Sequence, residues 1–200
     1  MRNWLRHAGM LAAACWLAAC TQAPVPLGRT WAQDVTGAPY GQDFLLTSMD
    51  GPQRSLTDYR GKVVVVFFGY THCPEVCPVT LYDFAQALHA LGAQKARQVQ
   101  VLFVTLDPSR DTPQVLRKFV RAFDPSFEGL YGDAARTAAT AAQFHVYFHV
   151  GPRDAAGQYF LDHSAYAYAY DRQGRLRLLM PFGEAPDELA HDLRTLLAAG

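Results

Sequence analysis

The chain has 200 residues, of which 50% are hydrophobic and 12% aromatic, enough apolar material for one folded domain with a proper core. Its 18 basic and 18 acidic residues balance to a formal net charge of +0. Proteins that bind nucleic acid through its phosphates normally carry a basic patch or excess. The composition therefore excludes a disordered chain and gives no sign of a nucleic-acid partner.

The first residues have the pattern of an export signal. Two arginines supply a positive start, and the apolar run from Met10 to Leu17 is too short to span a bilayer. Small residues then lead directly to a cysteine in Leu17-Ala18-Ala19-Cys20, which resembles a bacterial lipoprotein signal. We expect residues 1–19 to be removed and Cys20 to carry lipid. The alternative is an ordinary secretory signal that leaves Cys20 free.

The remaining cysteines and the segment after the signal indicate how the mature chain is organised. Cys15 lies inside the signal, so only Cys73 and Cys77 remain beside the lipidated residue. Residues 20–37 contain two prolines and no hydrophobic period, which is typical of a tether. We therefore expect a lipid-anchored protein of the bacterial cell envelope, with residues 38–200 forming one domain that faces the periplasm.

The first half of this domain predicts a hairpin and a strand-helix-strand unit. The pattern from Phe44 to Leu56, around Asp50-Gly51, indicates a short hairpin. Six apolar residues from Val63 to Phe68 predict a strand buried on both faces. A helix with Pro78 at its first position follows. A second apolar strand, Val99 to Leu106, completes a parallel pair with the usual right-handed crossover.

The second half predicts three more helices and a closing hairpin. Thr112 or Asp111 can cap a helix that has Pro113 at its first position. Tyrosines that alternate with alanines indicate a strand with one aromatic face. The expected elements are the helices 113–123, 133–144 and 186–197 and the strands 165–170 and 176–180. Together these elements predict an α/β protein of the thioredoxin-like fold, with a central mixed sheet flanked by helices, inserted helices and an N-terminal hairpin.

Cys73 and Cys77 lie where the buried strand gives way to the following helix. The positive end of a helix dipole favours the thiolate, which is both the nucleophile and the metal ligand. We therefore interpret the two residues as a reactive pair rather than a buried structural one. If the segment is helical, their spacing places both sulfurs on one face, where they can bind one copper(I), zinc or iron–sulfur centre. The alternative is a disulfide that staples the turn.

A third ligand is expected from the segment before the closing hairpin, because this segment approaches the cysteine pair in thioredoxin-type folds. Here it contains His163, the candidate imidazole ligand. Asp162 either orients this ring or lies in solvent, and His72 either acts on the adjacent thiol or is a simple loop residue. His145 and His149 are four residues apart, but they lack the glutamate of zinc protease helices and are not expected to bind metal.

Three segments in this order carry a resemblance to a known family: Gly61–Pro78, Thr105–Pro113 and Asp162–Ser164. They resemble the signature segments of the Sco/SenC copper-binding proteins, and the similarity covers roughly Phe44 to the C-terminus. The resemblance implies that Cys73, Cys77 and His163 bind one copper ion, as Cu(I) and Cu(II). It also implies a role in assembling the dinuclear copper centre of cytochrome c oxidase. One departure is Glu75, where aspartate is more usual.

The expected function is that of a monomeric copper metallochaperone, rather than mainly an enzyme. Its expected partners are the apo-subunit of cytochrome c oxidase, an upstream periplasmic copper donor, and the membrane through the lipid anchor. The alternative is a thiol–disulfide oxidoreductase that reduces the cysteines of the oxidase copper site with Cys73 and Cys77. A peroxidase of the peroxiredoxin type is disfavoured, because Thr71 lies two residues before Cys73 rather than three.

Overall fold

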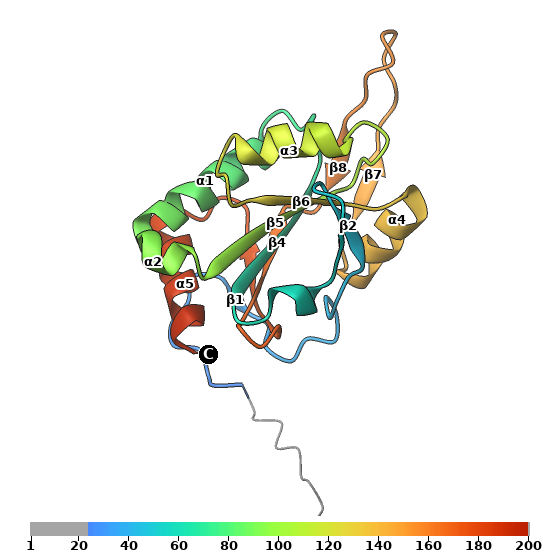
Figure 1. Ribbon diagram of the computed structural model, residues 1–200. Helices are drawn as coiled ribbons and strands as arrows, with labels where there is room; N and C mark the ends of the chain where they lie inside the picture. Colours follow the sequence, from blue (N-terminus) through green and yellow to red (C-terminus); the bar gives the residue numbers. More distant parts are fainter. Residues whose placement is uncertain (1–23, 200) are drawn as a thin grey trace, which may run out of the picture.

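The structure, a computed structural model, describes residues 24–199. Its centre is an eight-stranded mixed sheet with helices on both faces (Figure 1). In spatial order the strands are β1 (Gln33–Asp34), β10 (Leu176–Pro181), β9 (Tyr166–Tyr170), β4 (Val63–Gly69), β5 (Val99–Thr105), β6 (Glu128–Tyr131), β2 (Leu46–Ser48) and β3 (Gln53–Arg54). This architecture confirms the predicted α/β, thioredoxin-like arrangement.

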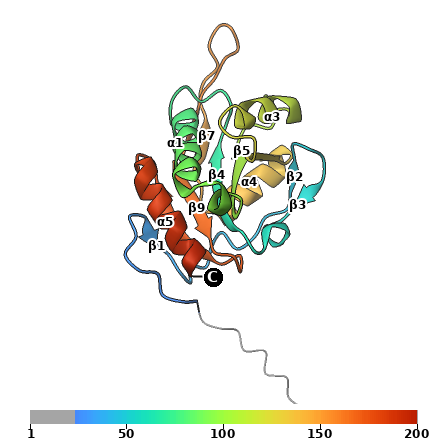
Figure 2. The same cartoon turned by 60° about the vertical axis from the view of Figure 1, so that its left-hand side comes forward.

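Five α-helices and one 3-10 helix are present between residues 24 and 199. They are η1 (Leu56–Tyr59), α1 (Val76–Leu91), α2 (Ala93–Ala96), α3 (Pro113–Arg121), α4 (Ala134–Gln143) and α5 (Pro186–Ala198). A separate hairpin of β7 (Phe148–Val150) and β8 (Leu161–His163) extends from one end of the molecule (Figures 1 and 2). None of the helices between residues 24 and 199 is long and apolar enough to cross a membrane.

Strand β4 is the centre of the core because all seven of its residues are buried. Alternate side chains point to opposite faces of a strand. Val65 and Phe67 therefore pack in the cluster formed with α1, α3 and α5. Val66 and Phe68 pack in the second cluster, formed with η1 and α4. The prediction of a strand buried on both faces is confirmed.

The strand-helix-strand unit and the closing hairpin also form as predicted. Strand β4 pairs in parallel with β5, with Val63 opposite Val99. The hairpin of β9 and β10 is antiparallel. In β9, Tyr168 and Tyr170 lie in the cluster under α4, whereas the intervening alanines face the other cluster. The alternation of tyrosine and alanine in the sequence therefore matches the two faces of the sheet.

Several element ends differ from the sequence prediction by one or two residues, and two boundaries differ in a way that changes the account of the domain. Helix α1 begins at Val76, so Pro78 is its third residue rather than its first. Proline is tolerated there because N–H groups in the first turn have no intrahelical acceptor. The domain also begins earlier than residue 38, because β1 lies inside the predicted tether and pairs with β10. The expected signal and Cys20 lie outside the described residues.

The segment before β1 is held on the domain by buried polar side chains. The Asp192 carboxylate, fully buried on α5, accepts hydrogen bonds from the backbone N–H groups of Trp31 (3.0 Å) and Ala32 (2.7 Å). The buried Arg177 guanidinium donates to the Val25 carbonyl and, at 3.2 Å, to Asp171. The part of the predicted tether that reaches the sheet is therefore folded onto it.

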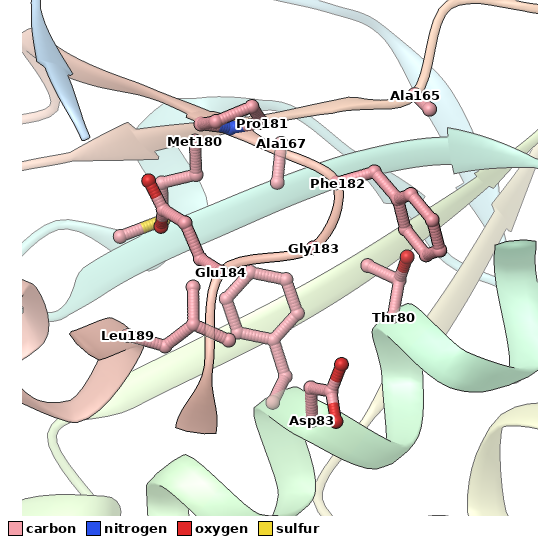
Figure 3. A pocket seen from close by; sticks show the side chains of 11 residues that line it. Thr80, Asp83, Ala165, Ala167, Met180, Pro181, Phe182, Gly183, Glu184 and Leu189 are labelled. Atoms are coloured by element: carbon pink, nitrogen blue, oxygen red, sulfur yellow. The ribbon is translucent and has the colours of Figure 1, made fainter. Parts of the chain in front are cut away.

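Glu184, in the turn before α5, should make stability depend on pH. It lies with Met180 and Leu189 on one side of a pocket that α1 borders on the other (Figure 3). Within the described structure, neither buried carboxylate oxygen of Glu184 has a hydrogen-bond partner. Burial, followed by the neighbouring Asp192, raises the pKa of Glu184 to about 7. This pKa is above the unfolded value of about 4.3, so stability is lost as pH rises through the folded pKa.

We therefore expect Glu184→Gln to be more stable than wild type at pH 8, because the amide removes a buried charge, and to match it at pH 4.5. Thermal unfolding at the two pH values measures this difference. The same Tm difference at both pH values would show that ionisation of Glu184 is not its source.

Candidate metal centre

Cys73 and Cys77 meet at the carboxyl end of β4. Cys73 lies in the turn before α1, where its N–H donates to the Tyr70 carbonyl at 3.2 Å. Cys77 is the second residue of α1. The segment between the two cysteines is therefore not fully helical, so the condition under which both would lie on one helix face is not met. The sulfur of Cys73 nevertheless faces the helix, because it accepts the N–H of Cys77 at 3.4 Å.

His163 reaches the thiols from the last position of β8. Its Nε2 lies 3.6 Å from Cys77 Sγ. Its Nδ1 lies 2.9 Å from the Ser164 carbonyl, which can only accept, so Nδ1 carries the proton. The lone pair of Nε2 is thereby directed at the thiols, as in metal-binding histidines. Asp162, which the sequence offered as an orienting group, is exposed.

The donor atoms of Cys73, Cys77 and His163 lie within 4.8 Å of one another. In residues 24–199 these side chains form the one such group that could hold a metal ion. Two donors bound to one ion at about 2.3 Å each can be at most about 4.6 Å apart, so small side-chain movements suffice. Two soft sulfurs and one imidazole suit copper(I) and zinc better than magnesium or calcium. The predicted residues are therefore brought together, with a chemistry that fits copper.

The two thiols differ electrostatically. The hydrogen bond from the Cys77 thiol, together with backbone N–H groups, outweighs burial and lowers the pKa of Cys73 to about 4. The same hydrogen bond, followed by burial, raises the pKa of Cys77 well above its usual range. Cys77 is also completely buried, whereas Cys73 is half-buried. The sequence predicted a reactive pair rather than a buried one, and only Cys73 has both the lowered pKa and the exposure that this prediction needs, since Cys77 is buried.

Access to the site is from the side of Cys73 and His163. Both line an open pocket of about 310 Å³ between the cysteine turn and β8. Phe160, whose exposed fraction is 62%, lies in its lining together with Glu75. Cys77 is not part of that lining. A partner entering the pocket therefore meets Cys73 and His163 first.

The three other histidines that the sequence analysis weighed, His72, His145 and His149, lie outside this cluster. His145 follows α4, where its ring contacts Tyr40 with centroids 4.7 Å apart. His149 belongs to β7, so the two histidines do not share a helix face. His72 is exposed, and its Nδ1 lies 3.2 Å from Thr71 Oγ1.

The comparison with known proteins decides the family. Residues 32–198 match the model of the SCO1/SenC family. The chain belongs to this family. Among its relatives is the mitochondrial protein SCO2 homolog of Bos taurus, 34% identical over 164 residues. That alignment covers 81% of this chain and 62% of the cattle protein, so the chain spans less than two thirds of this relative.

Solved structures support the same placement of this SCO1/SenC protein. Bradyrhizobium japonicum ScoI with copper bound is 38% identical, with a TM-score of 0.71 over 78% of this chain and 98% of that one. Apo Sco1 of Thermus thermophilus is 35% identical, with a TM-score of 0.75 over 84% and 97% of the two chains. The resemblance expected from the three sequence segments is therefore confirmed at the level of family and fold.

Proposed function

We propose that this SCO1/SenC protein is a copper metallochaperone that binds one copper ion through Cys73, Cys77 and His163. The observation that carries the proposal is the convergence of two sulfurs and a correctly oriented Nε2 within 4.8 Å of one another, beside a pocket that Cys73 and His163 line. The copper in the Bradyrhizobium japonicum ScoI structure supports the choice of ion. The partner that receives the copper is the apo-subunit of cytochrome c oxidase, and an upstream periplasmic donor supplies it.

The pair of unlike thiols fits capture and release. At neutral pH Cys73 is already a thiolate and lies at the pocket, so it supplies the first sulfur to an incoming ion. Cys77 must lose its proton to become the second ligand, so binding releases a proton. Three protein ligands leave a position open, through which an acceptor can bind the ion before the donor releases it.

The proposed location is the periplasmic side of a bacterial membrane. Support comes from the N-terminal sequence, which resembles a lipoprotein signal ending at Cys20. A lipid on Cys20 would keep the domain close to a membrane-bound oxidase. Mass spectrometry of the purified protein tests this proposal, since a mature chain that begins with diacylated cysteine supports it and an unmodified cysteine contradicts it.

A second function has its own support. Cys73 is a low-pKa, half-buried thiol, and Cys77 lies against it as a resolving thiol. The Cys73 thiolate can attack a substrate disulfide to form a mixed disulfide, which Cys77 then resolves. The substrate gains two electrons and two protons, and the protein is left with a Cys73–Cys77 disulfide. The oxidase subunit with oxidised copper-site cysteines is the proposed substrate of this reaction.

Removing the imidazole separates the two functions. We expect the reduced full-length chain in detergent, titrated without oxygen, to bind one copper(I) per chain and to show a thiolate-to-copper(II) charge-transfer band. His163→Ala should lose this band while retaining copper(I) through the two thiolates. No copper binding by wild type, with equally fast disulfide reduction by wild type and variant, would instead establish the oxidoreductase.

A further inference from the structure

The loop between β5 and α3, residues 107–112, contacts the two segments that lead to the donor residues, through Thr71 before Cys73 and through Tyr159 before β8. Asp111 in this loop is 1% exposed. Its carboxylate accepts hydrogen bonds from the Thr71 N–H at 3.0 Å and the Thr71 hydroxyl at 2.6 Å. A third comes from the Thr105 hydroxyl at 2.6 Å. Because Thr71 lies two residues before Cys73, Asp111 ties the cysteine turn to the end of β5.

Capping of helix α3 does not explain this buried carboxylate. The sequence offered Thr112 or Asp111 as the cap, and the structure assigns the role to Thr112, whose hydroxyl accepts the Val115 N–H at 3.3 Å. A carboxylate can be buried at tolerable cost only when hydrogen bonds replace its lost water. Two of the three that Asp111 receives come from the cysteine turn.

The other end of the loop holds the hairpin that ends in His163. Asp107, which is 4% exposed, accepts the Tyr159 hydroxyl at 2.9 Å. It also accepts the Arg110 guanidinium, which in turn donates to the Tyr159 carbonyl at 3.0 Å. The guanidinium lies over the Tyr159 ring, 3.5 Å from its centroid. Tyr159 is two residues before β8 and four before His163, so Asp107 and Arg110 fix the chain that leads to the third ligand.

We infer that Asp111 and Asp107 are positioning residues that hold the cysteine turn and the histidine hairpin at the separation one copper ion requires. This inference rests on the proposed copper function, because positioning the ligands matters only if they bind copper. The hydrogen bonds themselves are made within the protein without copper. Cys73 and His163 come from loop and hairpin segments that β-sheet pairing does not connect. The loop 107–112 is bonded to both, so a movement of either end changes the distance between sulfur and imidazole.

Thr105 joins the backbone of Asp107 to the carboxylate of Asp111. Its hydroxyl accepts the Asp107 N–H at 2.9 Å and donates to Asp111. Thr105 is the last residue of β5, and its relative exposed surface is 0%. The contacts of Asp111 with the cysteine turn and those of Asp107 with Tyr159 therefore start from one fixed point on the central sheet. Mutation of groups that orient metal ligands typically costs about 10–100-fold in metal affinity.

A pair of substitutions at Asp111 tests the inference. Asp111→Ala removes all three hydrogen bonds, whereas Asp111→Asn can keep them if its oxygen faces the Thr71 N–H and its amide donates to the Thr71 hydroxyl. We expect Asp111→Ala to bind copper(I) about 10–100-fold more weakly in competition with a chromophoric chelator. It should also shift or broaden the thiolate-to-copper(II) band, and Asp111→Asn should restore both properties.

The control is Asp192→Ala, which removes an equally buried carboxylate of α5 that accepts the backbone N–H groups of Trp31 and Ala32 and no group of the cysteine turn. It should lower Tm as Asp111→Ala does and leave the copper affinity and the band unchanged. Equal copper affinity and an identical band in Asp111→Ala and wild type would overturn the inference. So would the same losses in Asp192→Ala, since they would then report stability alone.

A measurement without copper keeps the inference distinct from the proposed function. In the metal-free protein, Asp111→Ala should speed amide hydrogen exchange in residues 70–75, and Tyr159→Phe should speed it in residues 158–163. Unchanged exchange in both segments would overturn the inference even if copper binds. Faster exchange in these segments, in a protein that binds no copper, would support the positioning role of Asp111 and Asp107 while contradicting the copper function. If Asp111→Ala does not fold, Thr71→Val and Tyr159→Phe each remove one hydroxyl and give the same comparison.

Discussion

Replacing Cys77 by serine should reduce copper(I) binding from one ion per chain to none that withstands a competing chelator. The sulfur of Cys77 lies 3.6 Å from His163 Nε2 and is completely buried, so no water can replace it as a ligand. A serine hydroxyl is a hard, protonated oxygen that copper(I) does not select. Cys73 and His163 would be left as an incomplete pair. Anaerobic copper titration with elemental analysis of the desalted protein measures the effect.

A matched control is needed because the new hydroxyl is also buried. Ala87→Ser introduces a hydroxyl at another fully buried position of the same helix, α1. It should lower Tm without changing the copper stoichiometry. Wild-type stoichiometry in Cys77→Ser would contradict the assignment of Cys77 as a ligand, and loss of copper in Ala87→Ser would attribute the effect to the helix rather than to the sulfur.

Gly69→Ala should damage both the fold and the metal centre. A Cβ at Gly69 would lie 2.6 Å from Cys77 Sγ and 2.9 Å from a ring carbon of Phe103. Neither atom can move freely, because both side chains are fully buried. Overpacking of this kind costs about 1–3 kcal/mol, and Tm falls by about 2–4 °C for each kcal/mol in a chain of this size. We expect lower Tm and weaker copper(I) binding together.

Gly28→Ala is the control for this substitution, since nothing lies within 4 Å of the added Cβ and the residue does not have a positive φ. It should match wild type in thermal unfolding and in copper competition. A Gly69→Ala protein with wild-type Tm and copper affinity would contradict this prediction, because it would show that the Cys77 sulfur can move away from the added Cβ.

The core and the ligand residues could be predicted from the sequence because their signals are local. Strand β4 is a continuous apolar run. The helix between β4 and the next apolar run, β5, predicts that the two strands pair in parallel. The capping threonine and Pro113 define the start of α3. The two cysteines and His163 were found from residue type and from their place relative to these elements. Their convergence follows from the fold, which the apolar pattern already specifies.

Other features depend on contacts that a linear pattern does not contain. Strand β6 is only Glu-Gly-Leu-Tyr, and it forms because β5 and β2 supply partners on both sides. The two residues of β1 carry no strand pattern of their own, and they form a strand because they pair with β10. The unequal pKa values of Cys73 and Cys77 arise from a hydrogen bond between them and from unequal burial. The role of Asp111 depends on a partner 40 residues away.

The proposed transfer of copper is tested most directly by mixing the copper(I)-loaded full-length chain with the reduced apo-subunit of cytochrome c oxidase. Copper in each protein is then measured after the two are separated. We predict that copper moves to the oxidase subunit, and that His163→Ala, loaded to the same level through Cys73 and Cys77, transfers it at a different rate. Copper that stays on this chain while its thiols reduce an oxidised oxidase subunit would contradict the copper chaperone and establish the oxidoreductase.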